Sequence, residues 1–179
     1  YLSVCEIVHR WTEVLNELVQ LPIGFIVALS GALIPGPLFT YIVAKSPRCG
    51  RFVGTKAVVG HAAVEAVILI LILLGMGAVL QYPAVQRAVG VVGGALLIGV
   101  GVLSAWRLRS RPRAERGTFV GYSPVVGGIL YSSVLNPTVP LWWATIGFAM
   151  LMEAYAVGAA LGVACWLVGH YLADFGWFS

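Results

Sequence analysis

Long apolar stretches separated by short polar segments make up most of the chain. Five of them are nearly free of charged residues, and they lie near residues 20–44, 55–80, 85–106, 123–149 and 154–174. A helix needs about 20 apolar residues to cross a bilayer, whereas isolated apolar strands would leave backbone groups unsatisfied in lipid. The pattern therefore predicts an all-α polytopic membrane protein with five spans.

Residues 1–19, which precede the first span, are more polar than the spans. From Val4 to Leu18 the apolar side chains recur at helical spacing, and the acidic residues lie mostly off that face. Such a pattern is typical of an amphipathic helix that lies along a membrane surface. We expect a short interfacial helix here.

Composition agrees with a membrane protein and excludes several other classes. Among the 179 residues 60% are hydrophobic and 10% are charged, whereas soluble domains carry about 25% charged residues. Three scattered cysteines predict neither a disulfide framework nor a zinc site. The few polar residues offer no pairing of a nucleophile with a base, so we expect neither an enzyme nor a bound cofactor or resident metal.

Positive charge is concentrated in two segments between spans. One holds Lys45, Arg48, Arg51 and Lys56, and the other is the arginine-rich loop 107–122. The positive-inside bias places such loops in the cytoplasm and the N-terminus outside, in a multi-pass protein of the cytoplasmic membrane. Arginines next to a span are topology signals or contacts to anionic lipid, so the net charge of +4 does not indicate nucleic-acid binding.

Two sequence patterns of the first half of the chain recur in the second half, either through an internal repeat or through chance similarity. Three residues of the first span recur at one constant offset in the fourth span, namely Ser30, Leu33 and Pro35 as Ser132, Leu135 and Pro137. The pattern Val-Gly-His-x-x-x-acid occurs in the second span and again in the fifth. Repeats of three spans at 20–106 and 123–179 would be inverted relative to each other, as in many secondary transporters. This reading predicts a sixth span beyond residue 179.

Prolines interrupt the two corresponding spans. Pro35-Gly36-Pro37 breaks the first span and Asn136-Pro137 breaks the fourth, because proline removes a backbone donor and clashes with the preceding turn. Broken helices at matching positions of two repeats indicate a central substrate site. We expect these five residues to line it. The alternatives are simple proline kinks, and an Asn136 side chain that only satisfies freed backbone groups.

The repeated histidine and acid are the candidates for ion coupling. His61 and Glu65 lie one helical turn apart, and so do His170 and Asp174. An acid inside a span normally faces a cavity or a partner, and histidine titrates near neutral pH. The alternatives are a pair that only locks two helices together and, for His170 and Asp174, a solvated helix end.

Small and aromatic residues predict packing. We expect the glycines at positions 50, 54, 60, 75 and 77, and those between 90 and 101, to allow close helix contacts, and a homodimer through such a face is possible. We expect Trp142, Trp143, Trp166 and Trp177 to be interfacial or packing aromatics.

The motifs resemble those of the lysine exporter (LysE/RhtB) family of translocators. The resemblance rests on Gly31-x3-Pro35-Gly36-Pro37, on Gly50-x3-Gly54-x5-Gly60 and on Leu135-Asn136-Pro137-Thr138, and it covers about residues 20–175. It implies export of amino acids driven by the proton gradient. The chain departs from the family pattern in having Leu38-Phe39 where an acid commonly follows Pro-Gly-Pro.

Two other functions remain open at this stage. The wider superfamily resembled here includes exporters of divalent metal cations, and His61, Glu65, His170 and Asp174 offer imidazole and carboxylate ligands that suit such an ion. A membrane scaffold that transports nothing would tolerate removal of both pairs. Transport that depends on pH would argue against the scaffold.

Overall fold

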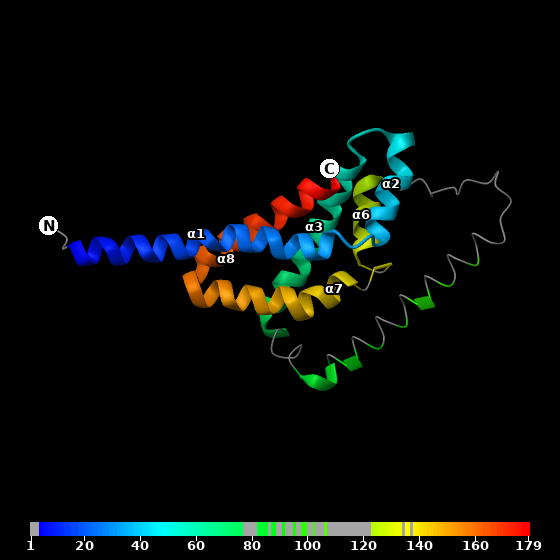
Figure 1. Ribbon diagram of the computed structural model, residues 1–179. Helices are drawn as coiled ribbons and strands as arrows, with labels where there is room; N and C mark the ends of the chain where they lie inside the picture. The colour runs from blue at the N-terminus through cyan, green and yellow to red at the C-terminus, as the bar shows by residue number, and fades with distance from the viewer. Residues whose placement is uncertain are drawn as a thin grey trace. The chain divides into compact units, whose positions relative to one another are not determined.

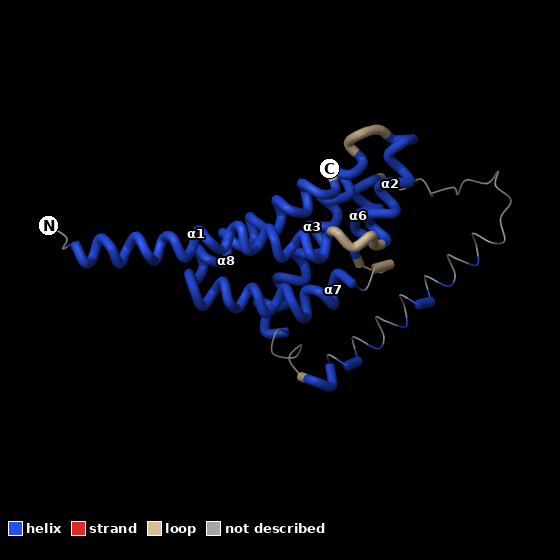
Figure 2. Tube along the Cα trace, in the orientation of Figure 1, coloured by secondary structure: helices blue, strands red, loops and turns tan. Residues whose placement is uncertain are grey.

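The computed structural model describes residues 4–76, 123–133, 135–136 and 138–179, together with a few positions between residues 82 and 106. Helices and short connections make up this part of the chain, and no strand occurs in it (Figures 1 and 2). The all-helical prediction is therefore confirmed for the described residues. The expected span at 85–106 lies largely outside them, and the basic loop 107–122 wholly so.

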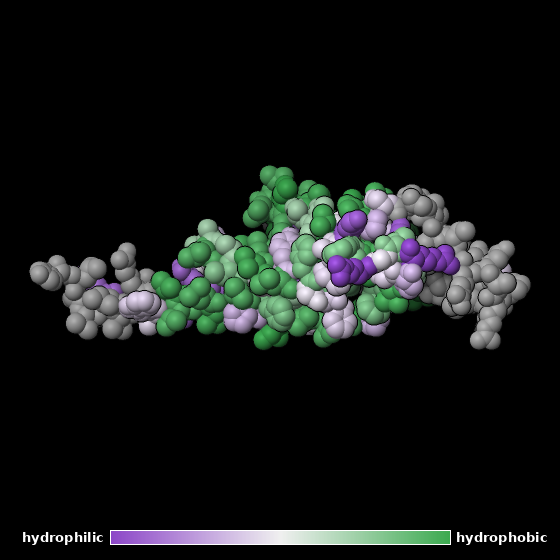
Figure 3. Space-filling view, turned by 90° about the horizontal axis from the view of Figure 1, so that it is seen from above, coloured by the Kyte–Doolittle hydropathy of each residue, from purple (hydrophilic) through white to green (hydrophobic). Residues whose placement is uncertain are grey.

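Three segments are long and apolar enough to cross a membrane. They are Val14–Ala32, Val53–Gly75 and Thr138–Phe178, and the last has 41 residues, enough for two crossings of about 20 residues each. On the face drawn in Figure 3, apolar side chains cover most of the coloured surface. These features fit a membrane protein, while five spans and an inverted repeat stay predictions.

The described residues form two compact units. One contains α1 (Val4–Ala32) and α8 (Phe148–Phe178). The other, residues 35–144, contains α2 (Pro37–Cys49), α3 (Val53–Leu71), α6 (Pro124–Ser132) and α7 (Thr138–Trp142). A π-helical turn, η1 (Ile72–Met76), extends α3, and another, η2 (Trp143–Gly147), follows α7. The units do not coincide with the predicted repeats, whose bounds stay predictions.

Both predicted helix breaks are present in the fold. α1 ends at Ala32, and α2 begins at Pro37 after an extended Gly36. In the second case α6 ends at Ser132 and α7 begins at Thr138. Each α-helix therefore stops within a few residues before its proline motif, as the missing backbone donors require.

Three boundaries differ from those predicted. The expected interfacial helix and first span form one continuous helix, α1, which passes through Pro22. α2 runs past residue 44 to Cys49 and ends at Gly50, whose φ of 86° suits glycine. Lys45 is therefore a buried helical residue, and its assignment to a loop was wrong.

The third difference concerns the end of the fourth predicted span. We expected a break between residues 149 and 154, near Glu153, but α8 continues through this region and changes direction at Gly158 and Ala159. Both residues have non-helical backbone angles. Glu17 of α1 lies against Gly158, where a Cβ atom would come within 2.6 Å of the glutamate Cγ. The turn is therefore fitted to α1, a contact that local sequence does not reveal.

Glycines have two distinct roles in these helices. Gly60 packs directly on another helix, as expected. At Gly50 and Gly75 an added Cβ would meet nothing within 4 Å, and their φ values of 86° and 99° mark them as turn residues. The prediction of close packing was wrong for these two.

Candidate functional site

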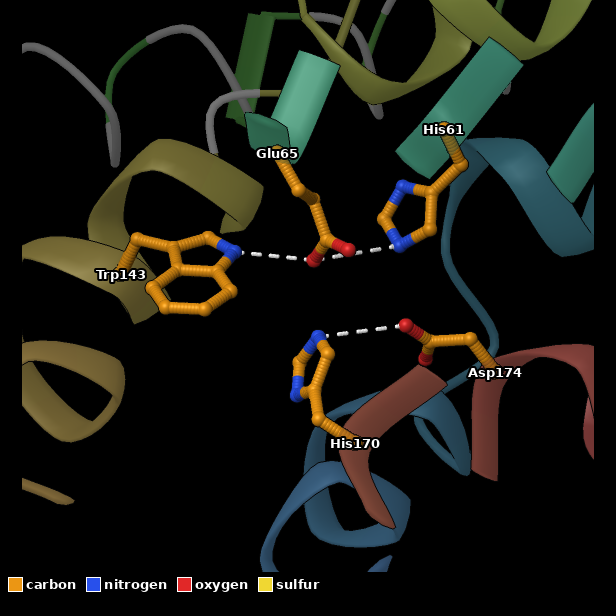
Figure 4. A network of polar contacts seen from close by, with 5 residues as sticks. All are labelled: His61, Glu65, Trp143, His170 and Asp174. Atoms are coloured by element: carbon orange, nitrogen blue, oxygen red, sulfur yellow. Dashed lines mark hydrogen bonds and ion pairs between the residues drawn. The ribbon is translucent and has the colours of Figure 1, made fainter. Parts of the chain in front are cut away.

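His61 and Glu65 form a buried pair on α3, inside a candidate membrane span. Glu65 lies about three turns from the start of α3. The Nε2 atom of His61 is 3.4 Å from the Oε1 atom of Glu65 (Figure 4), and Glu65 is only 2% exposed. The predicted pairing of an imidazole with an intramembrane carboxylate is present in the structure.

Trp143 is a further member of this site, and sequence reasoning missed it. Its indole Nε1–H donates a hydrogen bond of 2.8 Å to Oε1 of Glu65 (Figure 4), and its side chain is 0% exposed. We expected an interfacial or packing aromatic here. The two residues are 78 positions apart in the chain, so no local spacing could have indicated the contact.

A close crossing of α3 and α6 holds the helix that carries this pair. A Cβ on Gly60, the residue before His61, would overlap the Val125 carbonyl oxygen. A Cβ on Gly128 of α6 would overlap the carbonyl oxygen of Ala57, one turn before His61. The backbones therefore touch at two glycines, and the position of His61 is set by main-chain contacts.

The second pair, on α8, is built in the same way. The Nε2 atom of His170 is 3.2 Å from the Oδ2 atom of Asp174, and the residues are 3% and 4% exposed. The alternative of a solvated helix end is therefore wrong for this pair. The Trp166 ring stacks on His170, with centroids 5.4 Å apart and an interplanar angle of 21°.

α8 packs against α1 (Figure 1). The glycines at this contact have the same spacing from the histidine as those between α3 and α6. A Cβ on Gly169, the residue before His170, would overlap the Leu21 carbonyl oxygen of α1. A Cβ on Gly24 would overlap the carbonyl oxygen of Trp166, one turn before His170. Each histidine and acid pair thus follows a reciprocal glycine crossing with the same residue spacing.

The described residues at the helix breaks, Pro35, Gly36, Pro37 and Asn136, belong to the unit formed by residues 35–144. Pro35 lies in the connection between α1 and α2, Gly36 precedes the first turn of α2, and Pro37 begins it. The side chain of Asn136 is buried, and its Oδ1 accepts hydrogen bonds from the Thr138 hydroxyl and, at 3.2 Å, from the Thr138 backbone N–H. Asn136 therefore satisfies a backbone donor freed at the break. Pro137 lies outside the described residues.

Comparison with known proteins identifies a family over most of the chain. The model of the LysE type translocators matches residues 29–179. Neither the curated proteins nor the solved structures gave a significant match. The matched segment includes both helix breaks and both histidine and acid pairs, and members of this family are membrane exporters. The chain belongs to the LysE type translocator family.

Proposed function

We propose that this exporter carries amino acids out of the cell and couples their export to proton entry through His61 and Glu65. The observation that supports it best is a carboxylate buried within an apolar candidate span and contacted by an imidazole. A charge at such a position costs at least ~2.5 kcal/mol on insertion scales, and ionisable residues within spans usually belong to ion pathways.

The chemistry of the pair suits reversible protonation. Glu65 accepts a hydrogen bond from Trp143, which fixes the position of one carboxylate oxygen. His61 offers a second titratable group one turn away, in the pH range where imidazole changes charge. In the proposed cycle a proton entering from outside neutralises the site, and its release to the cytoplasm restores the carboxylate. One amino acid leaves the cell in exchange for the entering proton or protons.

The broken helices are the proposed substrate region. The proposed residues are Pro35, Gly36, Pro37, Asn136 and Pro137. They lie in the sequence from the end of α1 to the first residue of α2 and between α6 and α7, and such interruptions are tolerated in a membrane where they line a cavity or meet protein. His170 and Asp174 are proposed as a second coupling pair. In the proposed topology the N-terminus is outside, the basic segments are in the cytoplasm, and the protein lies in the cytoplasmic membrane.

Flux measurements on the full chain in proteoliposomes test this proposal. The vesicles are loaded with a mixed pool of amino acids and with Mn²⁺, and efflux of each is followed under an imposed pH gradient. We expect amino acids to leave the wild-type vesicles, Glu65→Gln to abolish the gradient-driven part, and Glu153→Gln, at an exposed position of α8, to retain it.

Two results would contradict the proposal. Efflux of Mn²⁺ without amino acids would favour a metal exporter, since imidazole nitrogen and carboxylate oxygen also bind divalent cations. A folded protein that carries neither would favour other solutes or a scaffold.

A further inference from the structure

The connection between α2 and α3 carries an exposed arginine that stacks on an exposed phenylalanine. The two helices are joined by three residues, Gly50, Arg51 and Phe52 (Figure 1). The Cζ atom of Arg51 lies 4.8 Å from the centroid of the Phe52 ring, a distance at which an aromatic face attracts a cation. Phe52 is 58% exposed, and Arg51 is also exposed. The stacked pair therefore lies on the surface of its unit.

Two further exposed cations lie within one helical turn of this connection. Arg48 belongs to the last turn of α2 and Lys56 to the first turn of α3. The backbone N–H of Lys56 donates a hydrogen bond of 3.1 Å to the Phe52 carbonyl oxygen, which keeps the start of α3 close to the stacked pair. No acidic residue occurs in the sequence from residue 18 to residue 64. This segment of the chain therefore has a local excess of positive charge, which attracts anions.

The stacked pair also lies where a candidate membrane span begins. That span starts at Val53, the residue after Phe52. Val53 packs inward and is 1% exposed, whereas the Phe52 ring points away from the protein core. Transfer of an exposed phenyl ring to the boundary between lipid headgroups and acyl chains removes apolar surface from water. Basic residues next to a span are attracted to anionic lipid. The cations and the ring thus favour the same partner.

We propose that Arg48, Arg51 and Lys56, together with Phe52, bind an anionic phospholipid through its phosphate group. The planar guanidinium group presents N–H donors that match phosphate oxygens, and the ammonium group adds a point charge. A soluble phosphate would leave the Phe52 ring in water, whereas a phospholipid covers both the charges and the ring. In the proposed topology this site faces the cytoplasmic leaflet. The site is independent of which solute the protein exports.

A fluorescent label on Cys49, the residue after Arg48, reports which lipid lies beside the site. The full chain with Cys5→Ser and Cys165→Ser is labelled at Cys49, which is exposed, and is reconstituted in phosphatidylcholine vesicles. Phosphatidylglycerol or phosphatidylcholine with a nitroxide near its headgroup is added, and quenching of the label measures binding of each lipid. We expect phosphatidylglycerol to bind up to about 100-fold more tightly, since each cation near an anionic surface contributes about 5-fold.

Two variants and a soluble competitor separate this site from a general effect of charge. Arg51→Gln should weaken binding of phosphatidylglycerol about 5-fold. Arg87→Gln, which removes an exposed cation outside this segment, should leave binding unchanged. Inorganic phosphate, added at constant ionic strength, should not displace the lipid. Equal quenching by the two lipids, an unchanged preference in Arg51→Gln, or displacement by inorganic phosphate would overturn the proposal.

A second measurement uses the wild-type chain and remains decisive if Arg51→Gln does not fold. Phosphatidylglycerol with a photoactivatable group near its phosphate is cross-linked to the protein in vesicles, and the modified peptides are identified by mass spectrometry. We expect adducts within residues 48–56 that excess phosphatidylglycerol suppresses and excess phosphatidylcholine does not. No adduct in this segment, or equal suppression by the two lipids, would contradict the assignment.

Discussion

Trp143 and His61 both contact the carboxylate of Glu65, and the two side chains differ in their chemistry. The uncharged indole N–H of Trp143 donates a hydrogen bond of 2.8 Å to the carboxylate. The Nε2 atom of His61 lies 3.4 Å from the same oxygen, and imidazole is a group that can change charge near neutral pH. Trp143 cannot accept or release a proton in this exchange, because an indole N–H is a donor only. In the proposed mechanism Trp143 is therefore a positioning residue, and His61 and Glu65 are the groups that take up and release the proton.

Trp143→Phe keeps a large aromatic ring and removes only the donor. We expect gradient-driven efflux to fall by about 10-fold or more, since hydrogen bonds to charged groups contribute about 1.5–3 kcal/mol, and we expect its pH profile to shift. The measurement is initial efflux rate against pH in proteoliposomes. Trp177→Phe, at an exposed position, is the matched control. An unchanged pH profile in folded Trp143→Phe would show that the hydrogen bond plays no part in coupling.

Single residues were predicted well where their side-chain type is unusual for its sequence surroundings. His61, Glu65, His170 and Asp174 stand out because ionisable residues are rare in apolar segments, and all four are buried in pairs. The hydrogen bond of Trp143 to Glu65 was missed, since it joins distant helices. Lys45 was assigned to a loop, since the sequence did not show where α2 ends.

At the scale of helices, the two glycine crossings determine where the histidine and acid pairs lie. Gly60 and Gly128 bring α3 and α6 into backbone contact, and Gly24 and Gly169 do the same for α1 and α8. Small residues at such contacts let helices approach closely in a membrane. The crossings are antiparallel, because contact positions that rise along one helix fall along the other.

Gly169→Ala should disrupt the α1–α8 crossing, because the new Cβ would overlap a backbone carbonyl that cannot move alone. Overpacking of this kind costs about 1–3 kcal/mol. Gly176→Ala lies on the same helix with nothing within 4 Å of its added Cβ, and it should be neutral or slightly stabilising because alanine favours helix. Thermal unfolding in detergent compares the two. Equal midpoints would mean that the crossing is not as close as described.

The sequence predicted the helix breaks at prolines correctly, but it did not predict where the other helices end or turn. Proline acts on its own backbone, so the interruptions at residues 33–36 and 133–137 could be predicted from Pro35, Pro37 and Asn136-Pro137. The turn at Gly158 and Ala159 lacks such a signal, and its fit to Glu17 becomes visible only in the folded unit. Glu153, the charged residue nearest to this turn in the sequence, predicted the break at the wrong place.

At the scale of the whole molecule, family membership and apolar helices identify a membrane exporter. The described residues divide into two units, and each carries one histidine and acid pair behind a reciprocal glycine crossing. The repeat itself stays a prediction from the sequence. The orientation of the repeats in a membrane remains a prediction.

Orientation can be tested with a native cysteine. Cys49 is exposed at the end of α2, next to the basic residues that we assign to the cytoplasm. In a variant with Cys5→Ser and Cys165→Ser, a membrane-impermeant maleimide should label Cys49 in inside-out vesicles and not in intact cells. Labelling in intact cells would reverse the proposed topology.

The most direct test of the central claim is the movement of protons during amino-acid export. Wild-type and Glu65→Gln proteoliposomes containing a pH-sensitive dye are loaded with an exported amino acid, and its efflux is followed together with proton entry. We predict that the wild type links the two fluxes. Glu65→Gln should lose proton entry and gradient-driven efflux but still exchange labelled for unlabelled amino acid. Proton entry linked to efflux at the wild-type ratio in Glu65→Gln would contradict the account.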